Sequence, residues 1–184
     1  MKKIFAIAAA VLLVYSLYGH AFAADVALTS VGQSPDAMMI RVVLRNMGIA
    51  HDYDSLMKPE MLADQKVLIA VVGGSSKGLG AAGIDEEEET ERAVALINAA
   101  REKGMKVLAM HVGGSGRRGQ LSDRFITAVV PLADALIVVE GGNEDGLFDK
   151  LTEGREIPMY GADSVKGTDV PLNRALSGWG VPVE

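Results

Sequence analysis

The chain alternates short apolar runs with segments whose apolar residues fall on one helical face. Short segments that are largely apolar occur at 26–31, 66–72, 106–112 and 135–140. Each run is too short for a typical helix but suits a buried strand. Weaker strands are predicted near 51–56 and 157–160. Strands that alternate with amphipathic helices predict an α/β fold: a three-layer, doubly wound, mainly parallel sheet of flavodoxin-like or Rossmann-like type.

Capping signals mark the predicted helices. Ser34 as N-cap and Pro35 at the first helical position begin a helix that stops at Gly48. Asp85 and Glu88 form a capping box at the start of the next helix, whose first turn of glutamates suits the helix dipole and is expected to be solvated. The remaining helices are predicted at 122–134, with Ser122 as N-cap, at 143–154, and at 171–180, with Trp179 against the body of the domain.

The first 23 residues have the pattern of a cleaved secretory signal. Lys2 and Lys3 precede an apolar run at 4–17, and small residues stand at Ala21 and Ala23. Cleavage after Ala23 leaves residues 24–184 as a single α/β domain that we expect to be periplasmic or secreted. No later segment is apolar enough for a membrane span after signal cleavage.

Composition excludes several classes of partner and site. The chain has no cysteine, so it forms no disulfide and no thiolate metal site. Cleavage would remove two lysines and no acidic residue, which changes the formal net charge from −6 to −8. Because phosphate neutralisation needs clustered lysine and arginine, we expect no nucleic-acid partner.

Three segments repeat a strand, a Gly-Gly pair and a polar loop. They are VLIAVVGGSSKG, VLAMHVGGSGRRG and ALIVVEGGNEDG. In a doubly wound sheet such loops lie at the carboxyl edge, where helices begin and ligands bind. The three loops together are therefore predicted to line one ligand-binding rim.

The first of these loops contains GSSKGLG, which is similar to the glycine loop of short-chain dehydrogenases. Dinucleotide binding would need a helix that begins inside the loop, whereas the helix signals begin only at Asp85. The following strand ends without an acidic residue suited to the ribose, and Tyr160 is not followed by lysine four residues later. The sequence therefore disfavours a nicotinamide cofactor, and we expect no cofactor.

The spans GGSSKGLGAAGID, HVGGSGRRGQLSDRFI and GGNEDGLF, read together, resemble a bacterial family of small secreted α/β proteins described only as a domain of unknown function. The resemblance covers nearly all of residues 24–184. It implies a secreted three-layer α/β domain and transfers no activity.

Basic residues in two of the loops indicate the chemistry of the rim. Lys77, Arg117 and Arg118 stand in an otherwise acidic protein and, with nearby helix N-termini, suit a carboxylate, phosphate or sulfate. The predicted ligand-binding residues are Ser34, Gly73, Gly74, Ser75, Ser76, Lys77, Gly113, Gly114, Ser115, Arg117, Arg118, Gly141, Gly142 and Asn143.

Acidic residues follow the third Gly-Gly strand. Glu140, Glu144 and Asp145 suit a zwitterion or a hard cation such as Ca²⁺, although helix capping and the helix dipole account for them without a ligand. No histidine cluster for zinc is evident, and no metal site is predicted.

The sequence leaves three functions open. The first is a non-enzymatic domain that binds a small anionic or zwitterionic ligand at the glycine-rich loops. The second is a hydrolase that uses His111 as general base with a loop serine such as Ser75, although no G-x-S-x-G nucleophile elbow is present. The third is an interaction module whose partner is another protein of the cell envelope.

Overall fold

The computed structural model describes residues 24–183, so the expected signal peptide at 1–23 lies outside the described residues. Six parallel strands form one sheet in the order β2-β1-β3-β4-β5-β6. The strands are β1 (Val26–Val31), β2 (His51–Tyr53), β3 (Val67–Val72), β4 (Lys106–His111), β5 (Ala135–Val139) and β6 (Met159–Ala162). The strand order reverses between β1 and β3, which makes this junction the topological switch point of the sheet.

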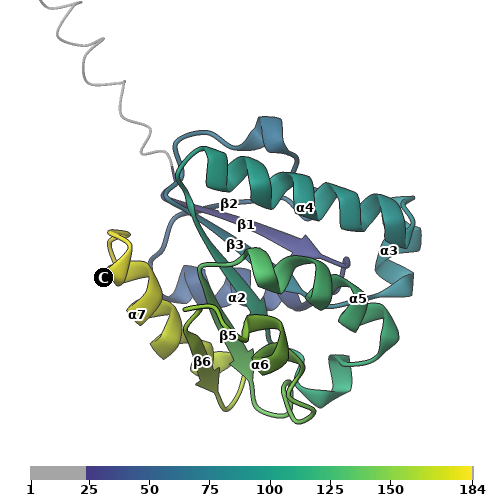
Figure 1. Cartoon of the computed structure of the whole chain (residues 1–184). Coiled ribbons are helices and arrows are strands. Elements are labelled where there is room, and N and C mark those ends of the chain that lie inside the picture. The colour runs from purple at the N-terminus through teal and green to yellow at the C-terminus, as the bar shows by residue number, and fades with distance from the viewer. Residues whose placement is uncertain (1–23, 184) are drawn as a thin grey trace, which may run out of the picture.

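Helices cover both faces of the sheet (Figure 1). One face is covered by α2 (Asp36–Asn46) and α7 (Asp169–Gly178). The other is covered by α3 (Ser76–Ala82), α4 (Glu86–Glu102), α5 (Gln120–Val129) and α6 (Leu147–Thr152). The predicted three-layer, doubly wound α/β fold is confirmed.

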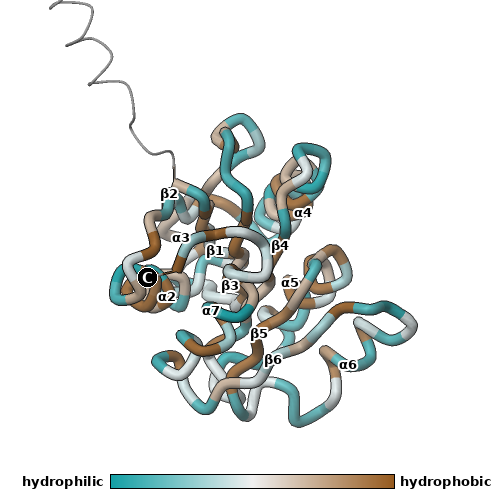
Figure 2. Tube along the Cα trace, turned by 90° about the vertical axis from the view of Figure 1, so that its left-hand side faces the viewer, coloured by the Kyte–Doolittle hydropathy of each residue, from teal (hydrophilic) through white to brown (hydrophobic). Residues whose placement is uncertain are grey.

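Two hydrophobic layers hold the helices to the sheet. Phe125 of α5 and Phe148 of α6 are fully buried on one face, and Ile40 of α2 packs with Leu172 of α7 on the other. Figure 2 shows the central strands largely in the hydrophobic colour, while the helices alternate between the two colours. This is the pattern of a parallel sheet that is buried on both faces.

Local prediction was accurate for β1, β3, β4, β5 and α4, while β2 is shorter than predicted and ends at Tyr53. The α4 capping box is present, since Asp85 accepts from Glu87 and Glu88 while the Glu88 side chain accepts from the Asp85 backbone N–H. The last strand lies at Met159–Ala162 rather than 157–160. Trp179 is half-buried against the α7 side of the core, as predicted.

Five helix starts differ from prediction, among them α6, which begins at Leu147 rather than 143, and α7, which begins at Asp169 rather than 171. The glycine loop after β3 does contain a helix start, because α3 begins at Ser76 with Ser75 as its N-cap. The prediction that the first helix signals after β3 begin only at Asp85 is therefore wrong, and a late helix start does not count against a dinucleotide here. Helix α5 begins at Gln120 rather than at 122, and α2 begins at Asp36 with Pro35 rather than Ser34 at the N-cap.

Within residues 24–183, no helix combines the length and the apolar character that a membrane crossing requires.

Candidate ligand-binding site

The loops after β3, β4 and β5 meet around two adjoining pockets at the carboxyl edge of the sheet. The first pocket, of about 230 Å³, lies at the start of α5 and is called the α5 pocket. The second, of about 320 Å³, is called the acidic pocket. The α5 pocket is lined by Gly74, Gly116, Arg117, Arg118, Gly119, Gln120, Leu121 and Ser122, and the acidic pocket by Ser115, Arg118, Gly119, Asp123, Gly141, Glu144 and Asp145. The two pockets share Arg118 and Gly119, so they form neighbouring halves of one depression.

The start of α5 gives the α5 pocket an affinity for negative charge. The first N–H groups of a helix have no acceptor within the helix, and the positive end of the helix dipole lies there. In α5 these amides belong to Gln120, Leu121 and Ser122, and all three residues line the pocket. The side chain of Arg117 adds a guanidinium that is 37% exposed. An anion in this pocket would meet both sources of positive charge.

The loop after β3 contributes little free backbone to the pockets, because its amides are already bonded. Gly73 N–H donates to the Val31 carbonyl at 2.9 Å, and Ser75 N–H donates to the Gly32 carbonyl at 2.8 Å. Gly74 N–H donates to the Ser122 hydroxyl at 2.8 Å. The Ser122 side chain thus accepts the Gly74 amide, and Ser122 is not the N-cap of α5. The structure joins this loop to its neighbours and leaves its amides unavailable to a ligand.

The switch point between β1 and β3 is closed by the protein itself. Gln33 and Gly74 form an antiparallel bridge, and Ser34 N–H donates to the Gly73 carbonyl at 3.2 Å. Gly78 also packs here, since a Cβ at this position would overlap the Gln33 carbonyl oxygen. The crevice in which doubly wound domains usually bind ligands is therefore filled by backbone.

A buried ion pair holds the loop after β1. Glu89 of α4 is fully buried and accepts from Gly32 N–H at 2.8 Å and from the Gln33 side chain at 3.0 Å. Arg92 pairs with Glu89 at 2.7 Å and also donates to the Ser30 carbonyl. The expectation of a solvated glutamate run is correct for the exposed residues 86–88 and wrong for Glu89, which lies on the face of α4 that meets the sheet.

Arg118 is fixed in place by its own contacts. It pairs with Asp123 at 2.7 Å and with Asp145 at 2.8 Å, and it donates to the Gly142 carbonyl at 2.6 Å. The hydrogen bonds that Arg118 donates to Asp145 and Asp123 raise the pKa of Arg118, and the same contact lowers the pKa of Asp145 from 3.8 to about 2. This side chain ties the start of α5 to the loop after β5, and its charge is largely neutralised by those two carboxylates.

Arg117 makes only one ionic contact among the described residues. Its Nε lies 3.5 Å from Oδ1 of Asp36, a carboxylate that is 1% exposed. Ser34 adds its hydroxyl nearby, where it accepts from the Asp36 backbone N–H at 3.4 Å. Arg117 therefore lies over a buried acid on the α2 side and lines the α5 pocket on the other.

His111 and Ser75 are not placed as a catalytic pair. The ring of His111 is buried, with Nδ1 3.0 Å from the Val72 carbonyl and Nε2 3.2 Å from the Gly114 carbonyl. The Ser75 hydroxyl accepts from Gly78 N–H at 3.0 Å as the cap of α3. Both side chains thus have structural partners, and the geometry gives no support to the hydrolase alternative.

The other predicted residues lie around the same edge with varied roles. Ser76 and Lys77 are exposed on the first turn of α3, outside both pockets. Asn143 accepts from Phe148 N–H at 2.9 Å and so supports the start of α6. Gly113 and Gly114 follow β4. Gly113 packs against the stem of Arg117, and the Gly114 carbonyl contacts Nε2 of His111. No group of three His, Asp or Glu residues within 24–183 is arranged to hold a metal ion.

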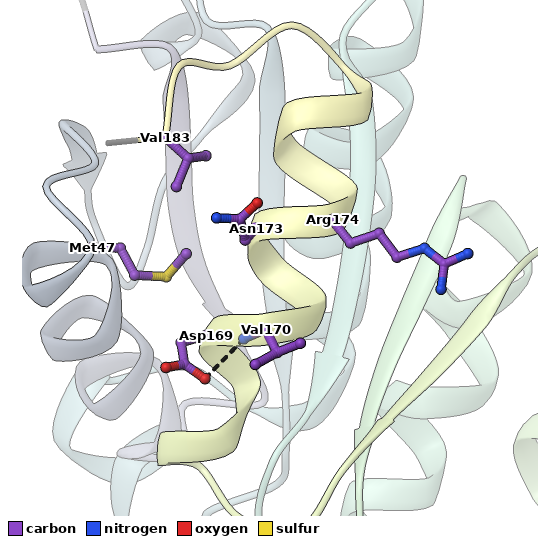
Figure 3. A pocket seen from close by; sticks show the side chains of 6 residues that line it. All are labelled: Met47, Asp169, Val170, Asn173, Arg174 and Val183. Carbon is purple, nitrogen blue, oxygen red and sulfur yellow. Dashed lines mark hydrogen bonds between the residues drawn. The ribbon is translucent and has the colours of Figure 1, made fainter.

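Besides a pocket of about 500 Å³ beside Lys66, Lys103 and Lys106 at the amino edge of the sheet, two further pockets lie away from the start of α5. One, of about 340 Å³, runs between the ends of β5 and β6 and includes Glu140, Asn143 and Tyr160. The other, of about 370 Å³, lies between Met47 and α7 (Figure 3). In that pocket Asp169 accepts from Val170 N–H at 2.8 Å, and Arg174 points away from Met47 toward Tyr160 of β6. The pocket beside α7 thus also includes a helix N-terminus and an exposed arginine, but Asp169 already accepts an N–H of that N-terminus and Arg174 is turned toward Tyr160.

The fold and this edge define a doubly wound α/β domain with a polar depression beside its fourth and fifth strands. The family model described as Domain of unknown function (DUF6305) matches residues 23–176, and the chain belongs to that family. No curated protein and no solved structure shows a significant match to the chain. The family model agrees with the resemblance drawn from the glycine loops in one respect: both identify a domain of unknown function.

Sequence reasoning missed Asp36, Glu89 and Arg92. Asp36 follows Pro35 at a helix start, where an acidic residue is ordinary, so its burial gives no signal in the sequence. Glu89 and Arg92 are three residues apart on a helix, which is a common solvent-exposed pair. Only the α4 apolar face, which includes Ala93, Leu96 and Ala100, indicates that Glu89 lies on the same buried side.

Proposed function

We propose that residues 24–184 form an extracytoplasmic, non-enzymatic domain that binds a small molecule through an anionic group held in the α5 pocket. The observation that carries the proposal is the convergence of Arg117 and the first turn of α5 on one pocket. The signal-like segment at 1–23 supports the compartment.

The charge distribution supports an anion here more strongly than elsewhere on the edge. Arg118 is neutralised by Asp123 and Asp145, whereas Arg117 has a single contact at 3.5 Å and remains partly exposed. A planar guanidinium beside free helix amides is well suited to a carboxylate, phosphate or sulfate. Arg117 is thus the side chain on which anion affinity should depend.

Binding of simple anions tests the proposal. The purified protein would be titrated with acetate, inorganic phosphate and sulfate while the backbone amide signals of Gly119, Gln120 and Leu121 are followed by NMR. We expect saturable shifts at these amides for at least one anion. In Arg117→Met, which keeps the apolar stem, affinity should fall by about tenfold, the effect of one charge-assisted hydrogen bond.

The matched control is Arg101→Met, which removes the same charge from the exposed last turn of α4. It should leave both the shifts and the affinity unchanged. No saturable shift with any of the three anions, or equal losses in Arg117→Met and Arg101→Met, would count against the proposal.

A further inference from the structure

Asp36, the ionic partner of Arg117, has a buried oxygen without a hydrogen-bond partner among the described residues. Its Oδ2 is buried and accepts no hydrogen bond from any group within residues 24–183. Its other oxygen, Oδ1, has Arg117 Nε at 3.5 Å, which is beyond a good charge-assisted hydrogen bond. A buried carboxylate is costly unless it is paired and hydrogen-bonded, so this arrangement needs a reason.

Arg117 is the group that covers Asp36. A Cβ on Gly113 would overlap the Cβ and Cγ of Arg117 and would lie 3.2 Å from Asp36 Oδ2. A Cβ on Gly73 would lie 3.1 Å from the same oxygen. Oδ2 therefore lies close to two residues that have no side chain, and the Arg117 stem lies over one of them.

The same arginine also lines the α5 pocket, next to the amides of the α5 first turn. An anion in that pocket attracts the guanidinium away from Asp36. A ligand that carries a positive group beside its anion supplies Asp36 with the partner that Arg117 gives up. Neither charge is then left buried and unpaired.

We infer that Asp36 is the cation-recognising half of this site, which binds a zwitterion whose ammonium group replaces Arg117 at the buried carboxylate. The inference rests on the proposed function and names its ligand class as amino carboxylates. The competing place for the ammonium is the acidic pocket, in which Glu144 is the exposed carboxylate without an ion pair among the described residues.

Matched pairs of compounds separate the two charges of the ligand. The purified protein would be titrated with acetate and glycine, propionate and β-alanine, and butyrate and 4-aminobutyrate, while the Gly73, Gly113 and Gly119 amides are followed by NMR. In at least one pair the amino compound should bind about tenfold tighter than its carboxylate, the effect of one charge-assisted hydrogen bond. In Asp36→Asn that advantage should shrink to within about twofold, while in Glu144→Gln it should remain.

The outcomes distinguish this inference from the function on which it rests. If carboxylates bind but amino compounds gain nothing, or if the gain survives Asp36→Asn or disappears in Glu144→Gln, only the zwitterion inference is overturned. If neither series produces a saturable shift, the anion-binding function itself is overturned.

A second variant covers the case in which Asp36→Asn does not fold. Arg117→Met removes the covering guanidinium, so methylammonium, a cation without an anion, should now shift the Gly73 and Gly113 amides. It should cause no such shift in the wild-type protein, where Arg117 covers Asp36. Equal responses of the two proteins to methylammonium would overturn the inference.

Discussion

The two sides of the carboxyl edge differ in how their polar groups are used. Beside β1 and β3, backbone hydrogen bonds and Glu89 occupy the amides of Gly32, Gly73 and Ser75. Beside β4 and β5, the start of α5 and the side chain of Arg117 border open pockets. A switch point is the usual ligand crevice of a doubly wound sheet, yet here it is the sealed side. The strand order alone therefore does not locate a binding site.

The difference has a local cause. Gln33 follows β1 with a long amide side chain that reaches both Glu89 and the Ser55 carbonyl. The loop after β4 has glycines at 113, 114 and 116 instead, and these have no side chain that could reach across the edge. We expect the sealed side to control stability and the open side to control binding.

The largest effect should follow from breaking the ion pair on the sealed side. Glu89→Ala leaves Arg92 as an uncompensated, mostly buried charge and removes the acceptor of Gly32 N–H. We expect a loss of about 3–5 kcal/mol in the free energy of unfolding, measured by urea denaturation. Glu87→Ala, which removes an exposed first-turn glutamate of the same helix, should cost no more than about 1 kcal/mol. Similar losses in the two variants would contradict the contrast between the two sides.

A smaller effect is expected from filling the contact between α3 and Gln33. Gly78→Ala places a Cβ against the Gln33 carbonyl oxygen and should destabilise the protein by about 1–3 kcal/mol. Gly80→Ala lies in the same helix, and its Cβ would meet nothing within 4 Å. It should stabilise the protein by about 0.5–1 kcal/mol, because alanine favours a helix over glycine. Thermal unfolding of both variants checks the opposite signs.

The smallest effect concerns the Arg118 tether on the open side. Asp145 has its pKa lowered from 3.8 to about 2 in the folded protein. A carboxyl whose pKa is lower when folded contributes its stability above pH 3.8 and loses it as the pH falls toward about 2. We expect the Asp145 carboxyl signal in NMR to titrate near pH 2, and nearer its ordinary value in Arg118→Met. The same midpoint in both proteins would show that Arg118 is not the cause.

Much of the fold could be predicted from sequence because its signals are local. Short, largely apolar segments predicted β1, β3, β4 and β5, and the Asp85 capping box predicted α4. Helix α3 was missed because Gly78 and Gly80 weaken its propensity, and Leu79 packs it into the core from a loop-like sequence. Tertiary contact overrode local preference at that point.

The candidate site was predictable only in part. The Gly-Gly repeats predicted that their loops share one edge. The two pockets at that edge are lined by Gly74, Ser115, Arg117, Arg118 and Gly141, among others. Whether each group remains available to a ligand depends on residues distant in sequence. The Ser122 hydroxyl accepts from the Gly74 amide, and Asp145 forms an ion pair with Arg118. The role of Asp36 depends on Gly113 and Arg117, which follow it by more than seventy residues, and no local pattern indicates that contact.

The uniform strand direction has a practical consequence for orientation. Every strand begins at one edge of the sheet and ends at the other, so Ala24, just before β1, lies about 20 Å from the carboxyl edge, the length of a six-residue strand. A protein immobilised through residue 24 on a sensor chip or a bead would present the α5 pocket outward to the solution. Attachment at that end is accordingly the geometry of choice for any surface-based binding measurement.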